Sequence, residues 1–120
     1  MKIFVLALAV SLAVLFAASD GRAAEVYFTG QILKEVCSGT SSMCTGYIMG
    51  FYDAGDHLSG PPGLNRKKWG NGSEACMPDG VKVDQLKEVV MKWLREHPEY
   101  WHASADSLAA SAVSDAWPCS

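Results

Sequence analysis

The sequence predicts an all-α protein, a small disulfide-stapled four-helix bundle behind an export signal. Three observations support this prediction. Apolar residues recur at helical spacing in several segments after residue 28. Four cysteines form an even set in a short chain. The chain has 120 residues, of which 49% are hydrophobic and 19% charged, so one globular domain is expected.

Residues 1–23 are predicted to be a secretory signal peptide. Lys2 precedes an apolar run from Ile3 to Ala18, shorter than the roughly 20 residues that a membrane-spanning helix needs. Small residues follow, and cleavage after Ala23 would leave a domain of residues 24–120. We therefore expect a periplasmic protein in a Gram-negative cell, with no membrane segment after cleavage. An uncleaved anchor is the alternative.

The four cysteines are expected to form two disulfides. They are Cys37, Cys44, Cys76 and Cys119. A domain this small buries little surface, and each disulfide would add about 2–4 kcal/mol of stability. Their spacing does not match a zinc site, and a catalytic thiol would leave one cysteine unpaired. Sequence alone allows three pairings.

The first helix is expected to begin after Thr29, whose hydroxyl suits the N-cap position. Phe28 and Leu33 flank this residue at the spacing of a hydrophobic staple. Ser38-Gly39 should end the helix.

A second helix is expected to begin at Ser41 or Ser42. Its apolar residues at helical spacing are Cys44, Tyr47, Ile48 and Phe51. Gly46 and Gly50 each cost about 1 kcal/mol relative to alanine in a helix. They are four residues apart and share a face, so we expect a neighbouring helix or ring to approach them closely. A buried strand is the alternative, because the segment is rich in aromatic residues.

Residues 55–75 are predicted to form a long irregular loop, because no periodic pattern continues there. Gly60-Pro61-Pro62-Gly63 is typical of turns. Arg66, Lys67, Lys68 and Trp69 follow, and Arg and Trp are favoured anchors of protein interfaces. Long loops in small domains are often functional, so we predict that these four residues contact a partner. A merely solvated loop is the alternative.

The third helix has the clearest pattern of the chain. Its apolar residues follow helical spacing throughout: Leu86, Val89, Val90, Trp93 and Leu94. Asp84 suits the first turn, and His97-Pro98 should end the helix because a residue before proline avoids helical geometry.

The fourth helix is expected to begin near Ser104 and to end at Pro118. Its apolar face is built of small residues: Ala105, Leu108, Ala109, Ala112, Val113 and Ala116. In an up-down-up-down bundle, the end of helix one lies beside the start of helix two, and the start of helix three lies beside the end of helix four. We therefore prefer the pairs Cys37–Cys44 and Cys76–Cys119.

The sequence predicts no enzyme, no cofactor and no metal site. Asp53 and His57 are four residues apart, but two potential ligands do not make a site. His97 and His102 flank a polar turn and are expected to be solvated. No phosphate loop, nucleophile elbow or zinc-protease motif is present. A formal net charge of −3 gives no reason to expect nucleic-acid binding.

Several segments together resemble the Rap/Tai family of type VI secretion immunity proteins. These segments follow one another in the same order as in the family, and they cover nearly all of the predicted mature chain. The segments are Cys37, Cys44–Ala54, Cys76–Val81, Gln85–Val90, Leu94–Glu99 and Ala116–Cys119. Two features depart from the pattern. Residues 60–73 lie outside it, and Val83 stands where a threonine N-cap would be usual.

This resemblance implies a mostly helical periplasmic protein that binds a peptidoglycan-cleaving amidase toxin, blocks its active-site cleft and thereby protects the producing cell. It also implies that a homodimer is possible. The matching residues look like scaffold, so the resemblance identifies no toxin-contacting residues. The alternative functions are a small periplasmic acid-stress chaperone, another exported binding protein and, least favoured, a small hydrolase or redox enzyme.

Overall fold

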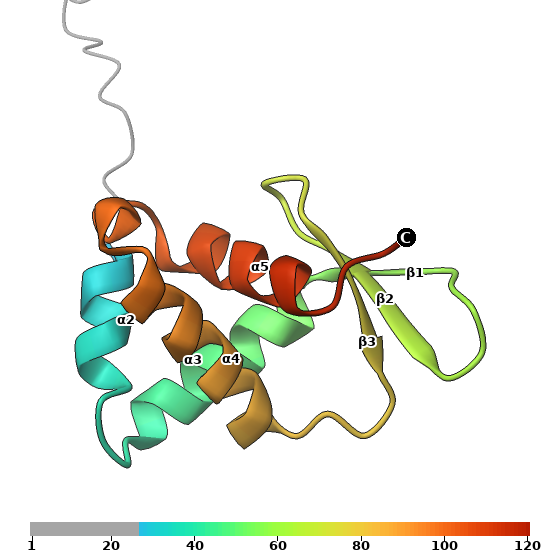
Figure 1. Cartoon of the computed structure of the whole chain (residues 1–120). Helices are drawn as coiled ribbons and strands as arrows, with labels where there is room; N and C mark the ends of the chain where they lie inside the picture. Colours follow the sequence, from blue (N-terminus) through green and yellow to red (C-terminus); the bar gives the residue numbers. More distant parts are fainter. Residues whose placement is uncertain (1–26) are drawn as a thin grey trace, which may run out of the picture.

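The computed structural model describes residues 27–120 and shows an α+β domain (Figure 1). Helices gather at one end of the molecule, and a three-stranded antiparallel sheet forms the other. The prediction of an all-α four-helix bundle is therefore wrong. The predicted signal peptide, residues 1–23, lies outside the described residues.

Four α-helices, one short 3-10 helix and three strands make up the domain. The helices are α2 (Gly30–Val36), α3 (Ser42–Ala54), α4 (Val83–Glu96), η1 (Pro98–Tyr100) and α5 (Ala105–Ala116). The strands are β1 (Asp56–Leu58), β2 (Leu64–Lys68) and β3 (Glu74–Pro78). The sheet order is β1-β2-β3, so β1, β2 and the start of β3 lie in the stretch, residues 55–75, that was expected to be a loop.

The four predicted helices are all present close to their expected bounds. The Thr29 hydroxyl accepts a hydrogen bond from the Ile32 backbone N–H at 3.3 Å, as an N-cap should. Helix α4 begins after Lys82 without a side-chain cap, and Asp84 lies in its first turn. It ends at Glu96, just before His97-Pro98.

The sheet is formed by two tight antiparallel pairings. β1 pairs with β2 so that His57 lies opposite Lys67, and β2 pairs with β3 so that Arg66 lies opposite Cys76. Gly63 and Gly72 have φ angles of +79° and +87°, a region that glycine enters without steric cost. The glycine- and proline-rich segments predicted as turns therefore connect strands.

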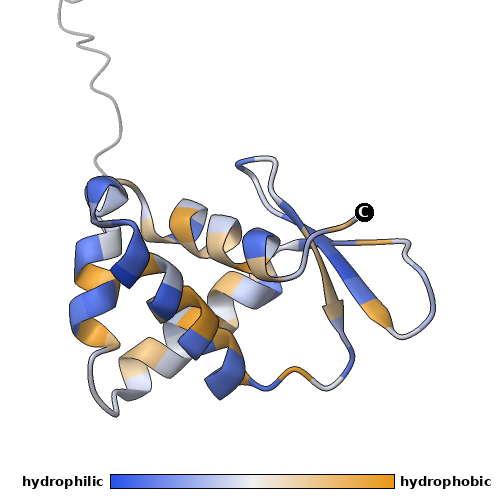
Figure 2. Cartoon of the chain, viewed as in Figure 1, coloured by the Kyte–Doolittle hydropathy of each residue, from blue (hydrophilic) through white to orange (hydrophobic). Residues whose placement is uncertain are grey.

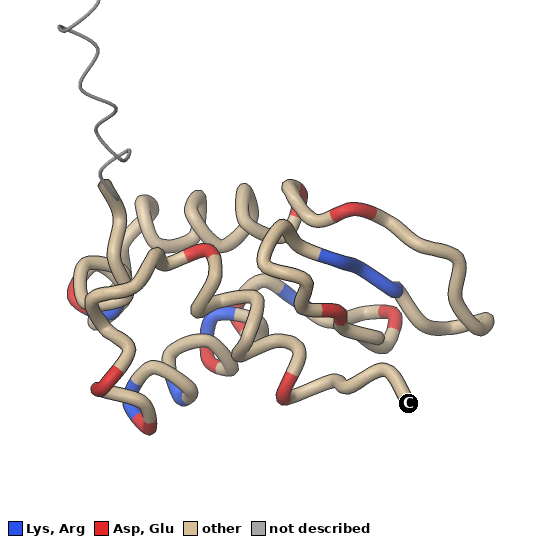
Figure 3. The backbone as a smooth tube through the Cα atoms, turned by 90° about the horizontal axis from the view of Figure 1, so that it is seen from above, with Lys and Arg blue, Asp and Glu red and all other residues tan. Residues whose placement is uncertain are grey.

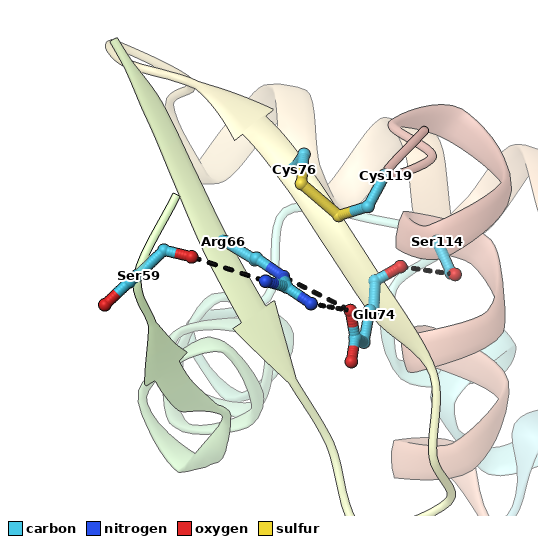
Figure 4. Close-up of a disulfide and its surroundings, with 6 residues drawn as sticks. All are labelled: Ser59, Arg66, Glu74, Cys76, Ser114 and Cys119. Atoms are coloured by element: carbon cyan, nitrogen blue, oxygen red, sulfur yellow. Dashed lines mark hydrogen bonds and ion pairs between the residues drawn. A yellow bond between two sulfur atoms is a disulfide. The ribbon is translucent and has the colours of Figure 1, made fainter. Parts of the chain in front are cut away.

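The hydrophobic core lies where α5 meets the other helices and the sheet (Figure 2). α5 buries a nearly continuous face of small side chains, which lets its neighbours approach closely. The buried residues of α5 are Ala105, Leu108, Ala109, Ala110, Ala112 and Val113. At the sheet, the Ser114 hydroxyl donates to the Glu74 carbonyl at 2.6 Å (Figure 4).

Two disulfides join Cys37 to Cys44 and Cys76 to Cys119. These are the two pairs preferred from the sequence, but the argument for the second pair was wrong. Cys76 lies in the middle of β3, and its bond ties the C-terminal segment to the edge of the sheet (Figure 4). The Cys76 backbone N–H also donates to the Trp117 carbonyl at 2.9 Å, so this segment follows the β3 edge.

Candidate partner-binding surface

The four residues predicted to contact a partner lie in the sheet. Arg66, Lys67 and Lys68 belong to β2, where Figure 3 shows the basic run as a blue stretch, and Trp69 follows the strand directly. Side chains alternate between the two faces of a strand. This alternation buries Lys67 and Trp69 and leaves Lys68 exposed.

Lys67 is completely buried, with 0% of its surface exposed. Its ammonium group donates to the Tyr52 backbone carbonyl and lies 3.9 Å from the centre of the Tyr52 ring. Burial lowers the pKa of Lys67, and the nearby carboxylates of Asp53 and Asp56 oppose this shift. The lysine therefore holds the last turn of α3 against the sheet.

Trp69 holds the same helix end through its indole ring. Nε1 donates to the Phe51 carbonyl at 3.1 Å, and the ring stacks on Phe51 with 5.0 Å between centroids. A Cβ atom at Gly55 would lie 2.7 Å from Trp69 Nε1, so only glycine fits there without a shift of the ring. The prediction that Lys67 and Trp69 lie in an exposed loop is wrong.

Arg66 is only partly available to a partner. Its Nη2 lies 2.8 Å from Glu74 Oε2, and its Nη1 donates to the Ser59 carbonyl at 3.4 Å (Figure 4). The hydrogen bond from Arg66 lowers the pKa of Glu74. Of the four predicted contact residues, only Lys68 is fully exposed, so whether this segment binds a partner stays a prediction.

A second surface is formed by the outward side of α3, which we call the α3 face. It consists of Met43, Gly46, Met49, Gly50 and Asp53, all exposed. Met43 and Met49 keep 61% and 51% of their surface accessible. Cβ atoms added at Gly46 or Gly50 would meet nothing within 4 Å, so the predicted close approach of a neighbouring helix or ring to these glycines is wrong.

The position of the α3 face could have been found from the sequence. At 100° per residue, Gly46 and Gly50 lie roughly 140° away from the apolar row of Cys44, Ile48 and Phe51. That row is buried in the core. The two glycines therefore had to face outward, although their cost in a helix suggested a close packing partner.

A pocket of about 190 Å³ opens beside the α3 face. Met49, Tyr52 and Asp53 form its α3 side, and the other walls come from β2, β3 and the start of α4. The remaining lining residues are mainly apolar and include Met77, Pro78, Val81, Val83 and Leu86. Asn65 and Lys82 add polar groups. None of the pocket's apolar side chains was predicted to form a site.

His57 and His97 belong to different parts of the fold. Asp53 ends up in α3 and His57 in β1, so they do not share a helix face. His97 stacks on Trp93 with 4.0 Å between ring centroids, and its Nδ1 lies 2.8 Å from the Trp93 carbonyl oxygen. Trp93 in turn donates to Asp115 Oδ2 at 2.8 Å, which ties α4 to α5.

Within residues 27–120, no group of three or more His, Cys, Asp or Glu residues is arranged to hold a metal ion. No helix in the same part of the chain is both long and apolar enough to cross a bilayer. All four cysteines are in disulfides, so none offers a free thiol.

Comparison with known proteins assigns this domain to a family. No curated protein and no solved structure is significantly similar to the chain. The model of the family described as Rap1a immunity proteins matches residues 29–119. This match runs from the N-cap of α2 to the disulfide-bonded Cys119 and therefore includes every helix and strand described above. The chain belongs to the Rap1a family of immunity proteins.

Proposed function

We propose that this immunity protein binds a peptidoglycan amidase delivered by a type VI secretion system and occludes its active-site cleft in the periplasm. The family match over residues 29–119 carries the proposal, because immunity proteins act on a cognate effector. The resemblance of the cysteine, helix-end and core segments to the Rap/Tai family supports an amidase as that effector.

Two properties of the domain support a role in the periplasm. Both disulfides are compatible with an oxidising compartment, where such bonds persist. The second one ties the C-terminal segment to the sheet and so protects a chain end that would otherwise fray. We propose that residues 1–23 direct the chain there and are removed.

The mode of action is occlusion without chemistry on the part of the immunity protein. The described domain has an exposed apolar helix face and an adjoining pocket. Surfaces of this kind suit the burial of a partner's side chains. A homodimer, implied by the family resemblance, would present two such surfaces to two effector molecules.

A protection assay tests this function. A candidate type VI peptidoglycan amidase is directed to the periplasm of a susceptible strain, which lyses. Co-expression of the full chain should prevent lysis, whereas a chain lacking residues 1–23 should not. Lysis that continues despite a confirmed periplasmic pool of the folded, disulfide-bonded protein would refute the proposed target. Light scattering of the purified complex gives its stoichiometry and tests the homodimer.

A further inference from the structure

We propose that the effector docks across the α3 face and inserts one large apolar side chain, flanked by a lysine or arginine, into the pocket between α3, the sheet and α4. This inference rests on the proposed immunity function and names the surface that performs it. It replaces the β2 segment as the principal contact region.

The first argument comes from the two glycines at the centre of the α3 face. Glycine inside a helix costs about 1 kcal/mol relative to alanine. At Gly46 and Gly50, nothing in the described residues uses the space that the missing side chains leave, since an added Cβ would meet none of their atoms within 4 Å. A partner whose backbone lies directly against the helix would use that space.

The second argument comes from the methionines beside those glycines. Met43 and Met49 lie on opposite sides of the pair and are both more than half exposed. Methionine is flexible and polarisable, so it adapts its shape to an incoming surface. The sequence of α3 contains a single charged residue, Asp53. This helix therefore presents an almost uncharged outer face.

The pocket determines what kind of group binds. Its volume of about 190 Å³ is below the roughly 300–1,000 Å³ of sites that take a drug-sized ligand or cofactor. It exceeds the roughly 150 Å³ of an apolar cavity that is known to hold a benzene ring. A pocket of this size can hold one leucine, phenylalanine or tryptophan side chain. Met49 belongs both to the pocket wall and to the α3 face, so the two form one continuous surface.

Charge determines what should flank the inserted side chain. Asp53 lines the pocket, and α3 contains no lysine or arginine to neutralise it. Among residues 27–120, the ion pairs within 4.0 Å are Arg66–Glu74 and Lys92–Glu96, so no basic side chain lies within 4.0 Å of the Asp53 carboxylate. The buried Lys67 ammonium interacts with Asp53 from a greater distance. Lys82 lies on the α4 side of the same pocket. A basic residue of the effector would therefore bind on the α3 side, next to Asp53.

The first test enlarges the two glycines. Gly46→Gln with Gly50→Gln improves helix propensity by about 0.5 kcal/mol per site, so the melting temperature should stay or rise. Calorimetric titration with the amidase identified in the protection assay should show an affinity about 30-fold or more below that of the native chain. Lys92→Gln, which puts the same side chain at an exposed site on α4, is the matched control and should bind like the native chain. Equal affinity of the double variant and the control would overturn the proposal.

The second test needs no effector. Methyl NMR of the methionines follows a titration with N-acetyl-phenylalaninamide, a probe that carries the expected side chain. The resonances of Met49 and Met77 should shift with saturation, while those of Met43, outside the pocket, and Met91, in the core, should stay unchanged. The absence of a saturable shift, or equal shifts at all four methionines, would overturn the pocket's assignment.

The third test examines charge. Asp53→Asn should weaken amidase binding and reduce its salt dependence, because one ionic contact is lost. Unchanged salt dependence would reject the basic flanking residue.

The tests also separate this inference from the proposed function. If the native chain does not bind the amidase, the proposed function fails and the methyl titration alone decides the pocket. If it binds and the glycine variant binds equally well, only the docking surface fails.

Discussion

The ammonium group of Lys67 lies 3.9 Å from the centre of the Tyr52 ring and donates to the backbone carbonyl of the same residue. A strand side chain thus adds a second donor to a carbonyl at the end of the helix, which also accepts from the Gly55 backbone N–H at 3.2 Å. Trp69 likewise donates to the Phe51 carbonyl. These two contacts hold the C-terminal end of α3, and hence one wall of the pocket, on the sheet.

Lys67→Ala should destabilise the domain by about 2–4 kcal/mol, because it removes a buried stem and leaves the Tyr52 carbonyl without this donor. Lys67→Met should cost less, because it keeps the apolar stem and removes only the ammonium group. Urea unfolding of both variants measures the difference. If Lys67→Ala lowers the free energy of unfolding by less than about 0.5 kcal/mol, Lys67 does not hold the end of α3 on the sheet as described.

The lowered pKa of Lys67 has a defined effect on stability. As the pH approaches 10.5, the ordinary pKa of a lysine, the Lys67 side chain of the unfolded protein still binds the proton that it has lost in the folded protein. Stability contributed by this residue should therefore rise with pH in that window. Unfolding free energies of the native chain and of Lys67→Met, compared over the same pH range, isolate the effect. A difference that stays constant would contradict the lowered pKa.

Trp69 and Gly55 are predicted to depend on each other. Trp69→Ala should cost about 3–5 kcal/mol, from lost burial and the lost hydrogen bond to Phe51. Gly55→Ala should also destabilise, since its new methyl group would meet the indole. In a Trp69→Ala background the same change should cost much less. A double-mutant cycle based on thermal unfolding gives the coupling energy, and additive losses would rule out the contact.

How much of this arrangement could be predicted from the sequence depends on which pattern each segment carries. All four helices could be located, because their apolar residues repeat at helical spacing and their ends carry caps or proline. The sheet could not. β2 reads Leu-Asn-Arg-Lys-Lys, and its inward-facing side chains are Asn65 and Lys67, so polar residues conceal the alternation. β1 has three residues, too few to show any period.

The burial of Lys67 and Trp69 could not be predicted for a related reason. A basic run next to a tryptophan is typical of exposed recognition loops, and nothing local distinguishes it from a strand whose lysine contacts a distant helix. Lys67 bonds a residue 15 positions earlier, and Trp69 bonds one 18 positions earlier. Such contacts follow from the tertiary fold alone. By contrast, the outward position of Gly46 and Gly50 was available from helical geometry.

The two disulfides should contribute unequally to stability. Cys76 and Cys119 are 43 residues apart, whereas Cys37 and Cys44 are seven apart, and cross-linking a longer loop removes more entropy from the unfolded chain. Replacing both Cys76 and Cys119 by serine should lower the free energy of unfolding by about 4 kcal/mol. Replacing both Cys37 and Cys44 by serine should lower it by less. Chemical unfolding under non-reducing conditions ranks them. The reverse order would show that local strain or residual structure dominates.

Tyr47 is predicted to make the protein sensitive to alkali. Burial, assisted by the nearby carboxylate of Asp106, raises the pKa of Tyr47 to about 12. Between pH 10 and 12 the unfolded chain loses this proton first, so stability from Tyr47 is complete below pH 10 and falls as the pH rises. Tyr47→Phe should lack this decrease. Parallel stability profiles for the two proteins would contradict the raised pKa.

The most direct measurement of the central claim is peptidoglycan hydrolysis by the purified amidase identified in the protection assay, titrated with the oxidised native chain. Our account predicts that hydrolysis falls linearly to background as the immunity protein reaches one equivalent, and that the chain alone releases no product. Full amidase activity in the presence of excess folded protein, or product release by the chain without amidase, would contradict it.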